Sequence, residues 1–310
     1  MGVIPVTHQK FIFKGQLMKK LKKILWPTDG SDESLNALKF AKMMSKEFNA
    51  NIKGYYVVTN LNYRKFNMLN MNINFDEFYN NEKNRANIIF NKVEKRLTKE
   101  KINFDYSFGF GNPAKEIVKY AEDNKIDIIV MGKRGIGLFD TNLTGSVTNK
   151  AIQSSSIPVL VSNPTIKRRR PNIKKILVPF NLNEDIISSI EYSVFLARKF
   201  NSTITIVYVE EYFTSTVEMP LHVLDDLRNY FNKKLDNLVN KYKKKGIKID
   251  TKVIESVNTY LGILRQCESL KPDLIVMNTH GRKGLKKYFI GSIAEKIIND
   301  MPCPVLTLKA

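Results

Sequence analysis

The sequence predicts two α/β domains in tandem, each a five-stranded parallel sheet with helices on both faces. Three observations predict this fold class. The chain has 310 residues, about twice the common size of a domain. It repeats four short landmarks in the same order, and in each copy apolar runs of strand length alternate with amphipathic stretches of helix length. This alternation, with continuous Ile and Val in the strands, is typical of a parallel sheet buried on both faces.

The four landmarks indicate an internal duplication, and they lie too far apart for solenoid repeats of roughly 20 to 50 residues. Each copy is therefore expected to be a domain. The expected division is an extension outside the fold at 1–18, a first domain at 19–163, a charged, proline-framed linker at 164–172 and a second domain at 173–310. The landmarks are Lys23–Pro27 with Lys175–Pro179, Ile126–Met131 with Lys271–Met277, Gly145–Ser146 with Gly291–Ser292, and Ile157–Leu160 with Cys303–Leu306.

In the first copy, apolar runs predict strands at 23–26, 51–58, 104–110, 126–131 and 159–162. Helices are predicted between them at 32–48, 77–101, 113–124 and 146–154. The first helix places Leu35, Leu38 and Met44 on one face, and the third opens with Pro113, which suits a first helical turn. The second copy predicts strands in the same order near Ile173, Thr203, Thr251, Leu274 and Val305.

Composition and charge narrow the class of protein. Hydrophobic residues make up 43% and charged residues 26% of the chain, close to globular averages, and no apolar run reaches the roughly 18 residues that span a bilayer. Two cysteines are too few for a disulfide framework, so the expected compartment is the cytoplasm. The three histidines are isolated from one another and from the cysteines, so no protein metal site is expected. The formal net charge of +20 favours anionic ligands without naming one.

Open parallel sheets bind ligands beyond the carboxyl ends of their strands, so the residues that follow the strands are candidates. After the first strand, Ser31 or Asp32 fits the N-cap of the next helix. Asp29 lies before that cap, where its carboxylate can accept hydrogen bonds from an adenine amine or a ribose hydroxyl.

After the fourth strand, Gly132 and Gly135 are followed by nine residues and then by Gly145-Ser146 at the start of a helix. Paired glycines let a ligand approach the backbone, and the N–H groups at a helix N-terminus attract phosphate. The spacing therefore favours a phosphate-binding loop over a plain turn.

The glycine spacing, the KILWPTDGS segment of the first copy and the closing IPVLV strand together resemble the universal stress protein family, in its ATP-binding branch. The resemblance covers both copies from Lys19 onward. It implies adenine-nucleotide α-hydrolase-like, Rossmann-like domains, in which Asp29 meets adenine or ribose, Val57 holds the adenine through its backbone and the glycine loop lines ribose and phosphates. The candidate site of the first domain is Pro27, Thr28, Asp29, Val57, Met131, Gly132, Arg134, Gly135, Gly145, Ser146, Val147 and Thr148.

The resemblance also implies the ligand and the way the domains pair. ATP is the expected nucleotide, with AMP and ADP as alternatives, and Mg²⁺ would be held only through the phosphates. In the family, pairing commonly uses the last strand, so Pro158–Ser162 and Pro304–Leu308 are the expected edges of an intrachain pseudo-dimer. The sequence leaves open whether the protein also forms a homodimer.

The second copy departs from the pattern at two positions. Asn181 stands where the first copy has Asp29, and Asn278 stands where it has Gly132. An Asn accepts a hydrogen bond without charge assistance, so a weaker nucleotide site is expected there, although its loop carries more cations. The candidate residues of the second domain are Asn181, Val209, Met277, Asn278, His280, Gly281, Gly291 and Ser292.

The expected function is binding of ATP, mainly by the first domain, as a regulatory nucleotide in stress adaptation. Two alternatives stay open. A slow ATPase or phosphotransfer enzyme would use Ser146 or Thr148 as the acceptor, but the sequence shows no general base for it. A basic nucleic-acid-binding protein would gather the clusters at 167–170 and 241–245 on one face, and specific nucleic-acid binding is not expected.

Overall fold

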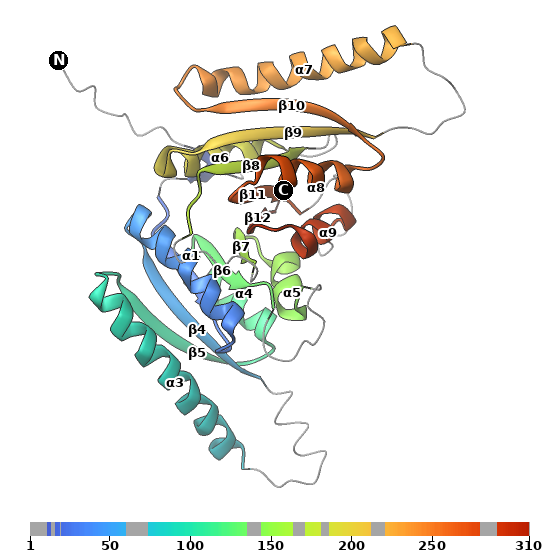
Figure 1. The fold of residues 1–310 in the computed structure, drawn as a ribbon. Coiled ribbons are helices and arrows are strands. Elements are labelled where there is room, and N and C mark those ends of the chain that lie inside the picture. The colour runs from blue at the N-terminus through green and yellow to red at the C-terminus, as the bar shows by residue number, and fades with distance from the viewer. Residues whose placement is uncertain are drawn as a thin grey trace, which may run out of the picture.

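The main body of the protein is a sheet layered between helices (Figure 1). The computed structural model describes residues 11–13, 16–18, 20–59, 74–134, 144–163, 171–180, 186–211, 221–279 and 290–309. Within these residues the strands form one ten-stranded sheet and a separate two-stranded hairpin. One face of the sheet is covered by α1, α3, α6 and α7, and the other by α4, α5, α8 and α9.

The first domain has the predicted five-stranded parallel sheet, in the order β5-β4-β3-β6-β7. Its helices α1 and α5 have the predicted bounds, and α3 begins two residues before the predicted start, where Asn74 is the N-cap. The strands are β3 (Lys23–Pro27), β4 (Asn51–Thr59), β5 (Phe104–Gly111), β6 (Ile128–Gly132) and β7 (Val159–Ser162). The helices are α1 (Asp32–Phe48), α3 (Phe75–Lys99), α4 (Pro113–Asp123) and α5 (Ser146–Ser154).

The second domain repeats the same topology, in the order β10-β9-β8-β11-β12. Its strands are β8 (Lys175–Phe180), β9 (Thr203–Glu211), β10 (Ile249–Ser256), β11 (Leu274–Asn278) and β12 (Val305–Leu308). Its helices are α6 (Ile186–Phe200), α7 (Leu221–Lys243), α8 (Thr259–Leu270) and α9 (Ser292–Asp300).

One aspartate in each copy fixes the start of the first strand of that copy. Asp127 Oδ2 accepts hydrogen bonds from the main-chain N–H groups of Lys22 and Lys23, at 2.7 and 2.8 Å. Asp273 Oδ2 does the same for Lys174 and Lys175, at 2.9 and 3.0 Å. These bonds give a structural reason for the aspartate in the repeated D-x-I-V-M landmark, because they help to fix the register of the first strand against the fourth.

The two domains join through their last strands, as the resemblance implies. β7 and β12 pair antiparallel, with Leu160 opposite Leu306, so neither strand is an open edge. On the α1 and α6 side, the Phe48 ring stacks on Phe195 at 5.0 Å and meets Phe200 edge-on at 5.9 Å. The hydrophobic core on that face therefore runs through both domains.

The hairpin lies in the segment expected outside the fold. β1 (Phe11–Phe13) and β2 (Gln16–Met18) pair antiparallel, and β1 lies near α6 of the second domain. Among the helices that the structure describes, none is long and apolar enough to cross a membrane.

Candidate functional site

The predicted site of the first domain lies where β3 and β6 run side by side, which is the switch point of the strand order. β4 pairs with one side of β3 and β6 with the other. The segments that leave the carboxyl ends of β3 and β6 therefore diverge to opposite sides, and the residues after these strands flank the crevice.

Asp29 lies in the turn between β3 and α1. Its Oδ1 accepts hydrogen bonds from the Ser31 N–H at 3.0 Å and from the Ser31 hydroxyl at 2.6 Å. Ser31 is the N-cap of α1, and its hydroxyl oxygen accepts from the Ser34 N–H at 3.2 Å. Thr28 supports the same turn, because its Oγ1 accepts from the Gly30 N–H at 3.1 Å. The carboxylate predicted to meet the nucleotide thus also shapes the turn that starts α1.

Helix α3 supplies a wall of this site that sequence reasoning missed. Glu82 accepts hydrogen bonds from the Tyr56 hydroxyl at 3.0 Å and from Arg85 at 2.9 Å. The pKa of Tyr56 is raised chiefly by burial, then by the charge of Glu82 and its hydrogen bond, with a smaller contribution from Asp29. A Cβ on Gly30 would lie 2.7 Å from the Ile89 side chain. The i, i+3, i+7 spacing of Glu82, Arg85 and Ile89 is the signal that could have shown them to share one helix face.

Gly132 ends β6, and its missing side chain makes room for α1. A Cβ there would lie 2.8 Å from the main-chain carbon of Glu33 and 2.9 Å from its oxygen. Glu33 also lies 3.6 Å from the guanidinium of Arg134, which is 10% exposed. Gly132 is therefore required for helix packing, whatever it does toward a ligand.

The two ends of the glycine motif meet in space. The Gly145 N–H donates to the Lys133 carbonyl at 2.8 Å, and the Thr148 hydroxyl donates to the Gly132 carbonyl at 2.9 Å. Thr148 is 3% exposed, whereas Ser146 is exposed and Val147 half-buried. Thr148 thus binds α5 to β6, and Ser146 is the hydroxyl of this helix start that faces solvent.

The N-cap of α5 favours an anion at its N-terminus. The cap residue is Gly145, which has no side chain to accept a hydrogen bond from the first turn. By contrast, the caps of α1 and α4 are Ser31 and Asn112, whose oxygens accept such bonds. A phosphate at the start of α5 would supply the acceptor that the cap residue lacks.

The second domain has the same elements around its candidate site, but different side chains at equivalent positions. Gly291 is the N-cap of α9, and its N–H donates to the Thr279 carbonyl at 2.9 Å. Asn278 is 3% exposed, and its Oδ1 accepts from the hydroxyls of Ser188 and Ser189 in α6 at 3.1 and 3.0 Å. A side chain thus lies where the first domain has Gly132 packed on main chain. Met277 is buried, Ser292 exposed, and Val209 packs on Gly262 of α8.

Four predicted site residues lie outside the described residues: Gly135, Asn181, His280 and Gly281. Among the described residues, no cluster of His, Cys, Asp and Glu could hold a metal ion. Both cysteines are buried, and burial raises the pKa of Cys267 to about 12.

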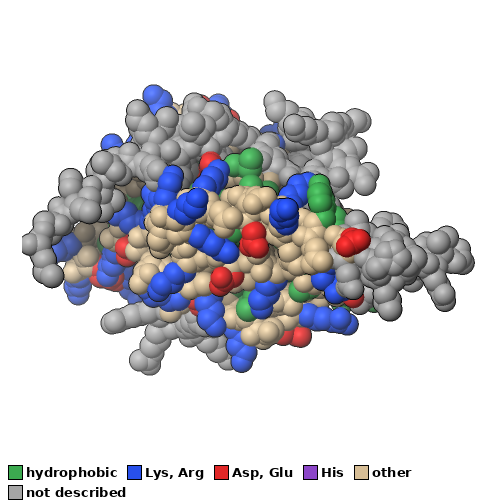
Figure 2. All heavy atoms as spheres, turned by 90° about the horizontal axis from the view of Figure 1, so that it is seen from above, with side chains coloured by type: hydrophobic (Ala, Val, Ile, Leu, Met, Phe, Trp, Pro, Cys, Tyr) green, Lys and Arg blue, Asp and Glu red, His purple; other side chains and the backbone are tan. Residues whose placement is uncertain are grey.

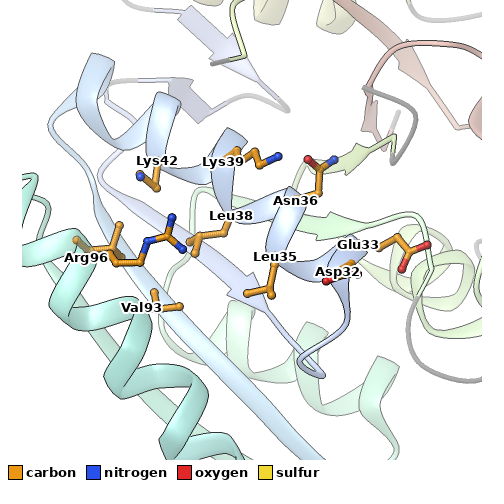
Figure 3. A pocket seen from close by; sticks show the side chains of 10 residues that line it. Asp32, Glu33, Leu35, Asn36, Leu38, Lys39, Lys42, Val93 and Arg96 are labelled. Atoms are coloured by element: carbon orange, nitrogen blue, oxygen red, sulfur yellow. The ribbon is translucent and has the colours of Figure 1, made fainter. Parts of the chain in front are cut away.

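A groove of about 550 Å³ lies between α1 and α3 (Figure 3). Leu35, Leu38 and Val93 form its apolar part, and Arg96 extends from α3 toward α1. In the described part of the chain, none of the predicted nucleotide-binding residues lines it. Glu33, which packs on Gly132, does line it, so the groove adjoins the α1 side of the switch point.

Basic residues are not gathered into one patch on the face seen in Figure 2. Lys and Arg side chains are spread over that face, with Asp and Glu between them. The cluster at 167–170 lies outside the described residues, so its position relative to 241–245 stays a prediction.

Comparisons with known proteins identify the two units. The model of the universal stress protein family matches residues 20–163 and again residues 172–309. Universal stress protein MJ0531 of Methanocaldococcus jannaschii is 36% identical over 140 residues, which cover 45% of this chain and 81% of that protein. The crystal structure of a universal stress protein from Archaeoglobus fulgidus aligns with a TM-score of 0.72 at 21% identity, over 93% of this chain and 98% of that one. A universal stress protein solved in complex with cAMP aligns over 46% of this chain and 97% of its own, with a TM-score of 0.36 at 20% identity.

Proposed function

The chain belongs to the universal stress protein family, with two such domains in tandem, and from this premise we propose that its first domain binds ATP as a regulatory nucleotide in stress adaptation. The observation that carries the proposal is the arrangement at the first switch point. There the Gly145 N–H donates a hydrogen bond to the Lys133 carbonyl, so the start of α5, which has no side-chain cap, lies at the end of β6. β6 pairs with β3, the strand that precedes Asp29.

The groups present suit the parts of a nucleotide. The start of α5 offers main-chain N–H groups and the positive end of the helix dipole to phosphates. Arg134 adds a largely buried cation after Gly132. Asp29, at the end of β3, offers a carboxylate to a ribose hydroxyl or an adenine amine, and the backbone of Val57 in β4 would hold the base. ATP supplies the anion, and Mg²⁺ would enter bound to its phosphates.

The second domain is proposed to bind nucleotide more weakly. The Asn278 amide oxygen accepts two hydroxyl hydrogen bonds from α6, and it holds the position that glycine has in the first domain. Asn181 replaces Asp29, so a charged acceptor is lost as well. The two domains would therefore differ in affinity while sharing one fold.

Calorimetric titration with MgATP tests the role of Asp29. Asp29→Ala should weaken binding by about 1 to 3 kcal/mol, because a buried donor of the nucleotide would lose its acceptor. Unchanged affinity would place the site elsewhere. Mass spectrometry of material purified under native conditions would identify any nucleotide that the protein retains.

A matched control separates the ligand contact from the turn. Ser31→Ala removes the N-cap hydroxyl that bonds to Asp29 but leaves the carboxylate in place. If Ser31→Ala lowered the ATP affinity as much as Asp29→Ala, the carboxylate would act through the turn alone, and the proposed contact would be wrong.

A further inference from the structure

The first glycine motif is held by a residue of the other domain. Asn299, in the last turn of α9, accepts a hydrogen bond through Oδ1 from the Thr144 N–H at 2.7 Å. The Thr144 hydroxyl donates to the same oxygen, and the ammonium of Lys133 donates to the main-chain oxygen of Asn299. Lys133 directly follows Gly132, and Thr144 directly precedes Gly145.

These bonds link Lys133, Thr144 and Asn299 in a partly buried network. Lys133 and Thr144 are 5% and 6% exposed. The Lys133 carbonyl already accepts from the Gly145 N–H at 2.8 Å, so the two ends of the motif and Asn299 fix one another. A lysine at the C-terminal end of α9 also interacts favourably with the helix dipole. Loss of the Asn299 side chain would leave the buried Thr144 N–H without this acceptor.

The equivalent residues of the second domain do not repeat the arrangement. Thr279 stands at the position of Lys133, and its N–H donates within its own domain, to the Leu308 carbonyl at 2.9 Å. Gln153 of α5 stands at the position of Asn299, and its main-chain oxygen accepts from Lys309, which follows β12, at 3.2 Å. At both positions the main-chain oxygen thus accepts from a lysine of the other domain, and Asn299 adds a side-chain bond to Thr144.

We propose that Asn299 of the second domain is a positioning residue for the nucleotide site of the first, an inference that rests on the proposed function. By holding the Thr144 amide, Asn299 fixes the approach to Gly145 and so the direction of the first N–H groups of α5. The nine-residue helix α9 begins beside Gly291, in the candidate loop of the second domain, and ends on the motif of the first. The second domain therefore sets the affinity of the first.

MgATP titration of the full chain tests this role with three variants. Asn299→Ala removes the acceptor and should weaken binding about 5- to 30-fold, as expected for the loss of a buried hydrogen-bond partner. Asn299→Asp keeps an oxygen acceptor and should restore affinity to within about threefold of wild type. Gln153→Ala, at the equivalent position of the first domain, should leave the affinity unchanged.

Hydrogen exchange gives a second readout that does not depend on ATP. In Asn299→Ala the amides of Thr144 and Gly145 should exchange faster than in wild type, while exchange in the β7 and β12 strands stays unchanged. Should the alanine variant fail to fold, Asn299→Ser shortens the side chain, keeps a polar group and takes its place in both measurements.

The outcomes separate the two proposals. If wild type binds MgATP and Asn299→Ala binds equally well, the positioning role is wrong and the proposed function stands. Equal losses in Asn299→Ala and Asn299→Asp would also overturn the role, because the acceptor would then not matter. If wild type binds no MgATP, the proposed function is wrong, and the positioning role of Asn299 is wrong as well.

Discussion

At the scale of single residues, Gly132 shows how packing and the candidate site share one position. The sequence pattern indicates a ligand-binding role for this glycine, because paired glycines let a nucleotide approach the backbone. The structure adds a second requirement, since a Cβ at Gly132 would meet the main chain of Glu33 at 2.8 Å. That requirement could not be predicted, because it depends on where α1 packs after the chain has turned.

Gly132→Ala should therefore destabilise the protein by about 1 to 3 kcal/mol, because main chain cannot move aside as a flexible side chain can. Denaturant unfolding measures the change. Gly291→Ala is the control, because the nearest atom to its Cβ would be the Thr279 carbonyl oxygen at an ordinary 3.5 Å. Equal stability of the two variants would show that α1 tolerates the added methyl group.

At this scale the sequence points to some residues of the candidate site, whose binding role stays a prediction. Asp29 and the ends of the glycine motif stand out in the sequence because they follow strands. Glu82 and Arg85 do not stand out, because they lie within a helix. Glu82 contacts Tyr56 of β4 only once α3 has packed on the sheet. Asn299 carries no sequence signal for the first domain at all, since its contact arises from the pairing of domains.

At the scale of elements, predicted and observed bounds agree where a local signal marks the start of a helix. Ser31 caps α1, and Gly145 precedes α5, so both helices start at the predicted residue. The sequence does not predict the β1–β2 hairpin, because its two short strands are only two residues apart in the sequence and β1 lies near α6, far along the chain. A contact so distant in sequence leaves no local pattern.

Helix α8 depends on a carboxylate from the end of β9. Glu211 accepts hydrogen bonds from the Thr259 hydroxyl at 2.6 Å and the Thr259 N–H at 2.7 Å. These two bonds, the hydroxyl first, lower the pKa of Glu211 below its ordinary value of 4.5. Because the folded-state pKa is the lower one, the stabilisation is present above about pH 4.5 and is lost as the pH falls through the folded-state value.

Glu211→Gln should lower the stability by up to about 1 kcal/mol at pH 7, since an exposed charged acceptor at a helix start becomes neutral. The loss should shrink as the pH falls below about 4.5 and the wild-type carboxyl takes up a proton. Urea unfolding at pH 7 and at a series of lower pH values measures it, with Glu210→Gln as the neighbouring control. A loss that keeps the same size down to the lowest pH at which the protein folds would mean that the charge of Glu211 does not support α8.

At the scale of the whole molecule, the two copies of one fold differ at the positions proposed to bind nucleotide. The duplication could be predicted from four landmarks, and the β7–β12 pairing from the family resemblance. The other contacts between the domains could not, because Phe48 against α6 and Asn299 against the first glycine motif join residues that lie far apart in the sequence. On the face in Figure 2 the described Lys and Arg side chains are spread out rather than gathered, which does not favour a nucleic-acid interface there.

Counting the MgATP sites of the full chain by titration decides whether ATP binds mainly in the first domain. The loss of a charged acceptor at Asn181 and the filled position at Asn278 should weaken the second site by about 2 to 4 kcal/mol, roughly 30- to 1000-fold. We expect one tight site per chain, weakened by Asp29→Ala and retained in Gly291→Val. Two equal sites, or a tight site that survives Asp29→Ala and is lost in Gly291→Val, would contradict this expectation.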